Sequence, residues 1–190
     1  MKREVMQLKI ELNYIVPQIW RRFIVDSLIS LHRLHEIVQD VMGWENAHLY
    51  SFYFQKKEYS VPFKDEFADF GEKVEDSKKA KLNNIGIKEK DKLRYLYDHG
   101  DSWEHTIKVE KIVESIEGTK VPYCLEGERN CPPEDCGSFP GYEDIVEAMK
   151  KPKSKKAEEF IEWLGEPYDP ECFDLKRINN SLNPNEIKKR

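Results

Sequence analysis

Apolar and polar residues alternate along the first part of the chain. Residues 6–12 read MQLKIEL, with every second side chain apolar, and residues 19–25 read IWRRFIV after a break at Pro17. A period of two is typical of a strand with one buried face. We therefore expect the chain to begin with two strands that pair as a β-hairpin.

The spacing changes to that of a helix in residues 31–41. Apolar side chains recur there every three or four positions, which places them on one face of a helix. Ser30 is a favourable N-cap, and Gly43 is a favourable residue for the end of the helix. This helix would pack its apolar face across the sheet.

Three further strands are predicted in the middle of the chain. Residues 48–54 are mostly aromatic, and residues 93–97 and 103–109 alternate between apolar and polar side chains. Residues 98–102 (DHGDS) hold a glycine and two aspartates, which favour turns. We expect a central hairpin with its turn at these residues and with Gly100 at positive φ.

Two segments show neither the period of two of a strand nor the spacing of a helix. Residues 55–81 are mainly charged with scattered aromatics, so we expect a long, poorly ordered loop insert. Residues 121–141 hold three cysteines, four prolines and three glycines. Three helices are expected after them: Tyr142–Lys150, a helix capped by Ser154 that stops at Gly165, and a last helix opened by Asp169-Pro170.

These elements predict an α+β fold. A mixed, mostly antiparallel sheet would carry one helix packed across it in a β-grasp-like arrangement. We expect residues 1–190 to form a single domain, with the sheet in residues 1–117 and the loop insert at 55–81. The Cys-rich segment and the C-terminal helices would occupy residues 118–190.

Composition narrows the class of protein. Charged residues make up 35% of the chain, hydrophobic residues make up 39%, and the net charge is −5. These values indicate a soluble globular protein and argue against non-specific binding of nucleic acid, although a local basic patch stays compatible with them. Apolar runs stay shorter than the roughly 18 residues of a membrane span, and the N-terminus shows no signal-peptide pattern. We expect a cytoplasmic protein that does not contact a membrane and whose cysteines stay reduced.

Three cysteines suggest a metal site. Cys124, Cys131 and Cys136 follow a C-x6-C-x4-C pattern, and the second pair falls within the spacing of structural zinc ligands. Zinc would anchor a segment that has few apolar residues, with His105 or Cys172 as the fourth ligand. The alternative is that the cysteines are reduced packing residues that behave as small hydrophobes.

Histidines and carboxylates form a second group of candidates, together with one tryptophan: His35, His48, Asp98, Asp101, Trp103, Glu104 and His105. Alternation along the strand places Trp103 and His105 inside and Glu104 outside. If the histidines converge, the group would form a hydrolytic metal site or an acid–base site. The alternative is that each histidine bonds to the backbone at the edge of the core, while Asp98 and Asp101 cap the turn.

Aromatic and basic residues offer a third possibility. Trp20, Arg21 and Arg22, with Trp44 and Trp103, would form a surface for a nucleic acid or a peptide. Alternation sends Arg21 and Arg22 to opposite faces of their strand. A packed core with flanking ion pairs therefore explains these residues equally well.

Several motifs of the chain resemble one known family. They are Trp20-Arg-Arg, Leu34-His-Glu, Met42-Gly-Trp44, Tyr97-Asp-His-Gly-Asp-Ser-Trp-Glu-His105 and Cys131-Pro-Pro-Glu-Asp-Cys-Gly137. Over nearly its whole length the chain is similar to the plasmid Ri ORF-three-like family, some members of which are labelled transposon passenger or TnpR-like proteins. That family has no assigned activity, and this chain shows no serine-recombinase motif. The family usually has Phe where this chain has His99, which argues against a catalytic or metal-binding role for that residue.

Two functions remain open. The leading hypothesis is a non-enzymatic binding or interaction module with a protein or nucleic-acid partner, which the resemblance links to mobile elements or DNA-handling proteins. The alternative is a metal-dependent hydrolase that uses the His, Asp and Glu cluster. An open polar cleft shared by His35, His48 and His105 would favour the hydrolase, and separate apolar surroundings would favour the binding module. Zinc is the cofactor that the sequence suggests.

Overall fold

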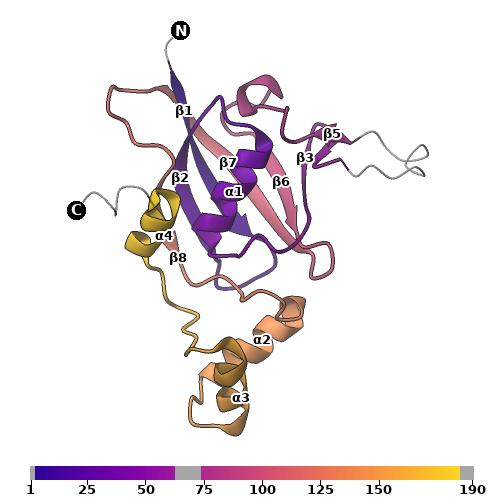
Figure 1. Cartoon of the computed structure of the whole chain (residues 1–190), viewed down its shortest axis with the longest axis vertical. Helices are drawn as coiled ribbons and strands as arrows, with labels where there is room; N and C mark the ends of the chain where they lie inside the picture. Colours follow the sequence, from indigo (N-terminus) through magenta and orange to yellow (C-terminus); the bar gives the residue numbers. More distant parts are fainter. Residues whose placement is uncertain (1–2, 63–73, 185–190) are drawn as a thin grey trace.

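A computed structural model describes residues 3–62 and 74–184 of the chain. The described residues form an α+β fold with one mixed sheet of eight strands and four helices (Figure 1). The strands are β1 (Glu4–Leu12), β2 (Trp20–Asp26), β3 (Tyr50–Phe54), β4 (Lys57–Ser60), β5 (Glu75–Asp76), β6 (Lys92–Tyr97), β7 (Trp103–Glu114) and β8 (Tyr123–Glu128). The helices are α1 (Leu31–Met42), α2 (Ser138–Met149), α3 (Lys155–Leu164) and α4 (Leu175–Leu182), with a short 3-10 helix at Leu82–Asn84.

The strands follow the order β5-β4-β3-β6-β7-β1-β2-β8. The predicted N-terminal hairpin of β1 and β2 is confirmed, as is the central hairpin of β6 and β7. β1 pairs antiparallel with both β2 and β7, so Leu8 lies opposite Phe23 on one side and Val109 on the other. Only β4 and β5 pair in parallel among the described strands, which makes the sheet mixed and mostly antiparallel as predicted. The finer prediction of a β-grasp-like arrangement stays a prediction.

The core lies between the sheet and α1. The predicted helix is confirmed: the Ser30 hydroxyl accepts a hydrogen bond from the Arg33 backbone N–H, and Gly43 ends the helix with φ of 98°. Its apolar stripe, which includes Leu34 and Val38, is fully buried against the inward side chains of the sheet. Burial of such a stripe, at about 25 cal/mol for each Å² of apolar surface, is the main source of stability for a short helix.

The turn of the central hairpin is confirmed, but its strained residues differ from the prediction. Tyr97 pairs with Trp103, so residues 98–102 form the connection. The residues at positive φ are Asp98 (53°) and Ser102 (56°), and Gly100 lies outside that region. The Asp98 carboxylate accepts a hydrogen bond of 2.8 Å from the Gly100 N–H. An aspartate whose side chain bonds to the backbone of its own turn tolerates the left-handed conformation. The turn therefore forms without positive φ at Gly100.

The predicted register of β7 is confirmed. Trp103 and His105 are buried, with exposed fractions of 1% and 0%, while Glu104 lies on the outer face and forms an ion pair of 3.0 Å with Arg94. The period of two therefore identifies correctly which side chains enter the core.

Parts of the predicted loop insert at 55–81 are ordered strands instead. β4 pairs with β3, where Tyr59 lies opposite Phe52 and is buried, and β5 adds to the edge of β4. Ser77 is also buried, and its hydroxyl lies 2.8 Å from the Tyr50 hydroxyl. Cross-strand pairing stabilises strands that are too short and too charged to be recognised by periodicity. The rest of this prediction, at residues 63–73, lies outside the described residues.

The second half of the chain also departs from the prediction. Residues 121–141 contain β8, which pairs with β2 at the edge of the sheet. α2 begins at Ser138 rather than Tyr142, and α4 begins at Leu175 with Asp174 as its N-cap, rather than at Asp169-Pro170. The helix starting at Lys155, with Ser154 as N-cap and Gly165 at its end, is confirmed.

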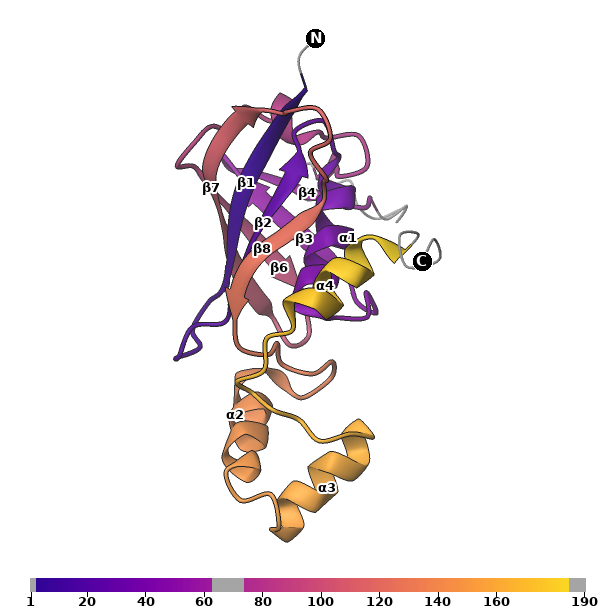
Figure 2. The ribbon, with the colours of Figure 1, turned by 90° about the vertical axis from the view of Figure 1, so that its left-hand side faces the viewer.

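The helices occupy two regions. α1 and α4 lie on the same side of the sheet, while α2 and α3 extend beyond its end as a helical pair (Figures 1 and 2). None of the helices within the described ranges is long and apolar enough to cross a lipid bilayer.

Candidate functional site

The tip of the β6–β7 hairpin is joined to the start of α2. The Asp101 carboxylate accepts a hydrogen bond of 3.2 Å from the Gly137 N–H, and the Ser138 hydroxyl donates one of 2.7 Å to the Asp101 carbonyl. Beneath them the Trp103 ring packs on Phe139, with 5.2 Å between ring centroids. Two segments that are more than thirty residues apart in the sequence therefore meet at this point.

A third segment, which follows α1, completes the junction. The Trp44 indole donates a hydrogen bond of 3.0 Å to the Pro132 carbonyl. Oε1 of Glu134 accepts hydrogen bonds from the Tyr97 hydroxyl at 2.8 Å and from the Glu45 N–H at 2.9 Å. These bonds fix the loop before α2 against both the hairpin and the end of α1. We call this meeting of residues 44–48, 97–101 and 131–138 the junction.

His48 lies in the junction among three carboxylates. Its Nε2 atom is 3.0 Å from Oδ1 of Asp135 and 3.8 Å from both Oδ2 of Asp98 and Oε2 of Glu134. Ligand atoms of His48, Asp98 and Asp135 all lie within 4.8 Å of one another, and no other set of three His, Cys, Asp or Glu residues in the described chain does so. We call these three residues the His48 cluster.

The His48 cluster has the chemistry of a cation site. Imidazole nitrogen together with carboxylate oxygen suits Zn²⁺ and, with more oxygen ligands, Mn²⁺. The Nε2 atom of His48 is buried, and its contacts with these carboxylates do not have hydrogen-bond geometry, so it faces the carboxylates without a hydrogen bond to them. The Asp98 side chain is 12% exposed and that of Asp135 is 69% exposed, so the cluster is closed on the hairpin side and open on the other.

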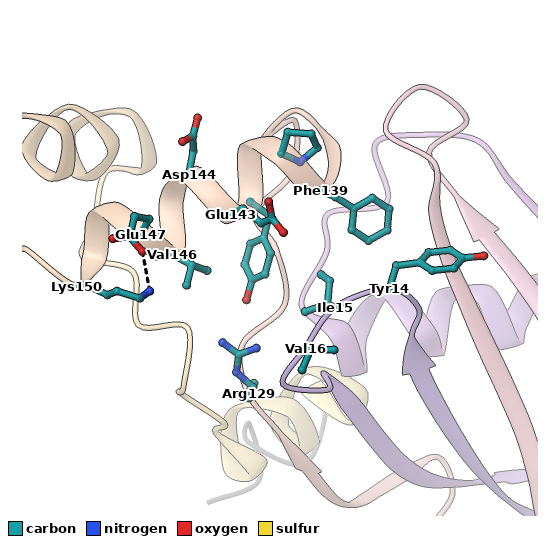
Figure 3. Close-up of a pocket in the computed structure, with 12 residues that line it drawn as sticks. Tyr14, Ile15, Val16, Arg129, Phe139, Glu143, Asp144, Val146, Glu147 and Lys150 are labelled. Carbon is teal, nitrogen blue, oxygen red and sulfur yellow. Dashed lines mark hydrogen bonds and ion pairs between the residues drawn. The ribbon is translucent and has the colours of Figure 1, made fainter.

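A cleft of about 590 Å³ lies on another side of α2 (Figure 3). The loop between β1 and β2 lines it with Tyr14 and Val16, whose exposed fractions are 77% and 93%. α2 lines the opposite wall with Phe139 and with the ion pair between Glu147 and Lys150. The cleft therefore has an apolar wall from the loop and a wall of mixed apolar and charged side chains from the helix.

Comparison with known proteins identifies the family. The sequence model of the family described as "Plasmid pRiA4b ORF-3-like protein" matches residues 4–177, which is most of the chain. The chain belongs to the plasmid pRiA4b ORF-3-like family.

Relatives of this ORF-3-like chain carry no assigned activity. It is 36% identical over 188 residues to "Uncharacterized protein y4hQ" of Sinorhizobium fredii, covering 96% of this chain and 93% of the relative. It also resembles the crystal structure of a protein of unknown function, MM3350 from Methanosarcina mazei Go1, with a TM-score of 0.82 and 35% identity over 93% of this chain and 97% of the other. The comparisons therefore support the fold and the family, and they name no substrate.

The other predicted histidines of the ORF-3-like chain do not join the cluster. His35 is buried on α1, where its Nδ1 lies 2.8 Å from the Tyr95 hydroxyl and its Nε2 lies 2.6 Å from Oδ1 of Asn46. Burial lowers the pKa of His35 to about 4 and that of His105 to about 3. Both rings are therefore neutral core residues, and the expectation that three histidines converge is wrong.

The remaining predicted side chains have structural partners in this ORF-3-like protein. Asp101 holds the start of α2, and Trp103 packs beneath it. Glu104 lies on the outer sheet face, where it bonds to Arg94 and Asn13. Of the seven candidates named from the sequence, His48 and Asp98 are the two that the fold brings into the cluster.

The cysteines of the ORF-3-like protein do not form the predicted zinc arrangement. A set made of Cys124, Cys131, Cys136 and His105 or Cys172 is not found among the described residues, because such a set would bring at least three ligand atoms within 4.8 Å. The Cys124 thiol faces the Arg22 carbonyl at 3.6 Å in the middle of the pairing between β2 and β8. Burial raises the pKa of the Cys124 thiol to about 11 and that of Cys136 to about 12. These thiols are neutral at physiological pH and pack as small apolar groups.

Two carboxylates near His48 in this ORF-3-like chain were not predicted from the sequence: Asp135, which belongs to the His48 cluster, and Glu134, which lies beside it. Glu134 and Asp135 stand between Cys131 and Cys136, whose spacing favoured the cysteines as ligands instead. The signal was a pair of acidic residues in a Pro-rich loop, where backbone bends can turn both side chains toward one point.

Proposed function

We propose that this protein is a binding module built around a divalent cation, with His48, Asp98 and Asp135 as ligands and Zn²⁺ as the first candidate ion. The observation that carries this proposal is the convergence of one imidazole and two carboxylates from three separate segments within 4.8 Å. Three protein ligands leave further coordination positions for water or for an external group. The proposed zinc ligands thus lie at the junction and not among the cysteines.

A cation at this position would do two things. It would offset the negative charge of Asp98, Glu134 and Asp135, which surround a single histidine, and so hold the loop before α2 on the hairpin. Its open side, next to the exposed Asp135 carboxylate, would accept an oxygen ligand from a carboxylate or phosphate group of a partner.

A metal-dependent hydrolase is the second candidate function. Glu134 favours it, because its Oε2 lies 3.8 Å from His48 Nε2 yet outside the His48 cluster. A carboxylate beside a metal-bound water is the arrangement that general-base hydrolysis uses. Against it, Oε1 of Glu134 already accepts two hydrogen bonds that hold the junction together.

The cellular setting belongs to the same proposal. The four cysteines are free in the structure, which suits a reducing cytoplasm. A role beside mobile elements or DNA-handling proteins, as the TnpR-like label of some relatives suggests, rests on the family resemblance.

Metal binding can be tested by calorimetry on chelator-treated protein titrated with Zn²⁺, Mn²⁺ and Mg²⁺. We expect one site per chain, and we expect His48→Gln and Asp98→Asn each to weaken it by more than about tenfold, since even residues beyond the ligands change affinity by 10–100-fold. Asn at position 98 keeps an oxygen for the Gly100 N–H, so the turn should persist. Asp144→Asn on α2 is the matched control, because its carboxylate pairs with Lys156 in an exposed ion pair outside the junction.

Two results would reject the cation site: wild-type protein that binds none of the three ions, or Asp98→Asn and Asp144→Asn proteins that bind equally well. Turnover of ester or phosphoester substrates by the metal-loaded protein, lost in Glu134→Gln, would move the assignment to the hydrolase.

A further inference from the structure

None of the described helices covers the face of the sheet opposite α1, which we call the open face (Figure 2). α1 and α4 both lie on one side of the sheet, and the α2–α3 pair extends beyond its end (Figure 2). Side chains on the open face alternate with buried ones along β2, β6 and the first part of β7, where Lys108 is exposed between buried Ile107 and Val109. Any ligand of this face would lie directly on the strands.

Four basic residues form one row across this face. Arg22 of β2 lies opposite Lys9 of β1, Lys9 lies opposite Lys108 of β7, and Lys108 lies opposite Lys92 of β6. All four side chains point outward, because the residues next to them in the strand are buried and successive side chains of a strand point to opposite faces. Lys92 begins its strand, so only the residue after it, Leu93, shows this. With strands about 4.8 Å apart, the row spans about 14 Å. We call these residues the basic row.

The basic row is only partly neutralised. Arg22 pairs with two carboxylates, Glu110 in two bonds of 2.6 and 2.9 Å and also Glu126, and Lys9 pairs with Glu11 at 2.6 Å. Lys92 and Lys108 are exposed, and neither forms an ion pair within the described part of the chain. Like charges directly opposite one another destabilise a sheet. The repulsion between Lys92 and Lys108 therefore lowers the stability of the sheet, and no ion pair with either lysine offsets it among the described residues.

Aromatic rings flank the basic row on its two sides. The Lys9 ammonium lies 4.6 Å from the centre of the Trp20 ring, and Arg22 lies 5.3 Å from it. In the adjacent row, Arg94 lies opposite Tyr53 and stacks over its ring at 3.8 Å. The open face therefore combines cations with half-buried rings at two places: Trp20 on β2 and Tyr53 on β3.

We infer that this face binds single-stranded nucleic acid, with phosphates along the basic row and bases against Trp20 and Tyr53. Cations that follow a phosphate backbone, next to aromatic rings on which bases stack, are how proteins bind single strands without sequence preference. A duplex keeps its bases stacked on one another, so it would not use the rings. A poly-glutamate peptide has no planar groups to stack on the rings, so it would use the cations alone. This inference does not depend on the cation at the junction.

The overall charge of −5 gives a specific expectation for this binding. Attraction comes from the local row and not from the whole molecule, so affinity should depend strongly on salt. The two unpaired lysines, each neutralising one phosphate, predict a slope of about −1.4 in a plot of log K against log salt concentration, from about −0.7 per phosphate for single strands.

Fluorescence anisotropy with labelled single strands of dT and of U tests the inference. In Lys92→Gln/Lys108→Gln we expect the magnitude of the slope to fall by about 1.4, because two phosphates are no longer neutralised by the protein. The control is Lys151→Gln/Lys153→Gln, which removes the same charge from two exposed lysines between α2 and α3 and should keep the wild-type slope. Trp20→Leu should weaken binding at every salt concentration while leaving the slope unchanged, because it removes base stacking and leaves the cations in place.

Thermal melts keep the test independent of folding defects. Removing Lys92 and Lys108 should leave the melting temperature unchanged or raise it at low salt, because cross-strand repulsion is relieved. The inference is overturned if wild-type protein binds neither strand, if both lysine double variants lose affinity equally, or if a poly-glutamate peptide binds the face more tightly than the single strands.

Discussion

His35 and His105 show how burial decides the role of a histidine. His35 uses both ring nitrogens, toward Tyr95 and Asn46, whereas the ring nitrogens of His105 have no hydrogen-bond partner among the described residues. His105 lies between the Trp44 and Tyr95 rings, with centroid distances of 5.1 and 5.3 Å. Neither environment accommodates an imidazolium, because water cannot reach the charge.

These two residues predict how stability depends on pH. Their pKa values are lowered to about 4 for His35 and about 3 for His105, chiefly by burial, whereas the unfolded chain titrates near 6.5. Between these values the unfolded state binds protons that the folded state does not, so stability is complete above pH 6.5 and falls as the pH is lowered. Each histidine should contribute a slope of about 1.4 kcal/mol per pH unit to the free energy of unfolding.

Urea unfolding between pH 7 and pH 5 measures this effect. His105→Leu should remove about half of the slope, because it removes one of the two buried imidazoles. His99→Gln is the control, since His99 is exposed at the hairpin turn and should leave the slope unchanged. A wild-type slope near zero in this range would show that the two histidines are not neutral in the folded state.

At the scale of elements, α4 completes the edge of the sheet. β8 pairs with β2 on one side only, and an unpaired edge leaves backbone groups without partners. Asn179 of α4 forms hydrogen bonds with two of these groups. Its Oδ1 accepts a hydrogen bond of 2.8 Å from the Cys124 N–H, and its Nδ2 donates one of 2.9 Å to the Cys124 carbonyl. One side chain thus substitutes for the strand that would otherwise lie there.

Asn179→Ala should destabilise the protein. It would leave a buried N–H and a buried carbonyl of Cys124 without partners, at a cost of about 1–3 kcal/mol in the free energy of unfolding. Asn180→Ala, at an exposed position of the same helix, should change stability little. Chemical denaturation of the two variants gives the comparison, and equal midpoints would mean that α4 does not hold the β8 edge.

At the scale of the whole molecule, the junction connects the sheet to the α2–α3 pair. Asp101 is the residue of the hairpin tip that reaches the start of α2, through Gly137 and Ser138. Beyond this point the two helices extend away from the sheet (Figure 2). The bonds made by one turn therefore control how firmly a large part of the C-terminal half is held.

Asp101→Ala should loosen the loop before α2 while the sheet stays folded. Hydrogen exchange of residues 131–141 should become faster, because the Gly137 N–H loses its acceptor and the helical pair loses one anchor. Exchange in β1 and β7, at the centre of the sheet, should not change. Asp144→Ala, which removes an exposed carboxylate of α2, is the control. Unchanged exchange in the Asp101→Ala protein would show that the other contacts of the junction hold it without this carboxylate.

The sequence alone determined those helices and strands whose apolar and polar residues follow a clear period. Alternation in β1 and β7 and the stripe of α1 depend on which side chains are buried, and burial sets a period of two or of 3.6 along the chain. Capping at Ser30 and Gly43 is equally local, so it was found at the right residues. The inward direction of Trp103 and His105 follows from the same period.

Tertiary structure decided what depends on pairing and on proximity. β4 and β8 are short and carry weak patterns, and they become strands because β3 and β2 offer them backbone partners. The His48 cluster joins residues that are up to 87 positions apart, and the basic row joins four strands through their register. Distances between residues far apart in sequence depend on how the whole chain packs, so spacing pointed to the cysteines as ligands although the fold placed a histidine and two aspartates together.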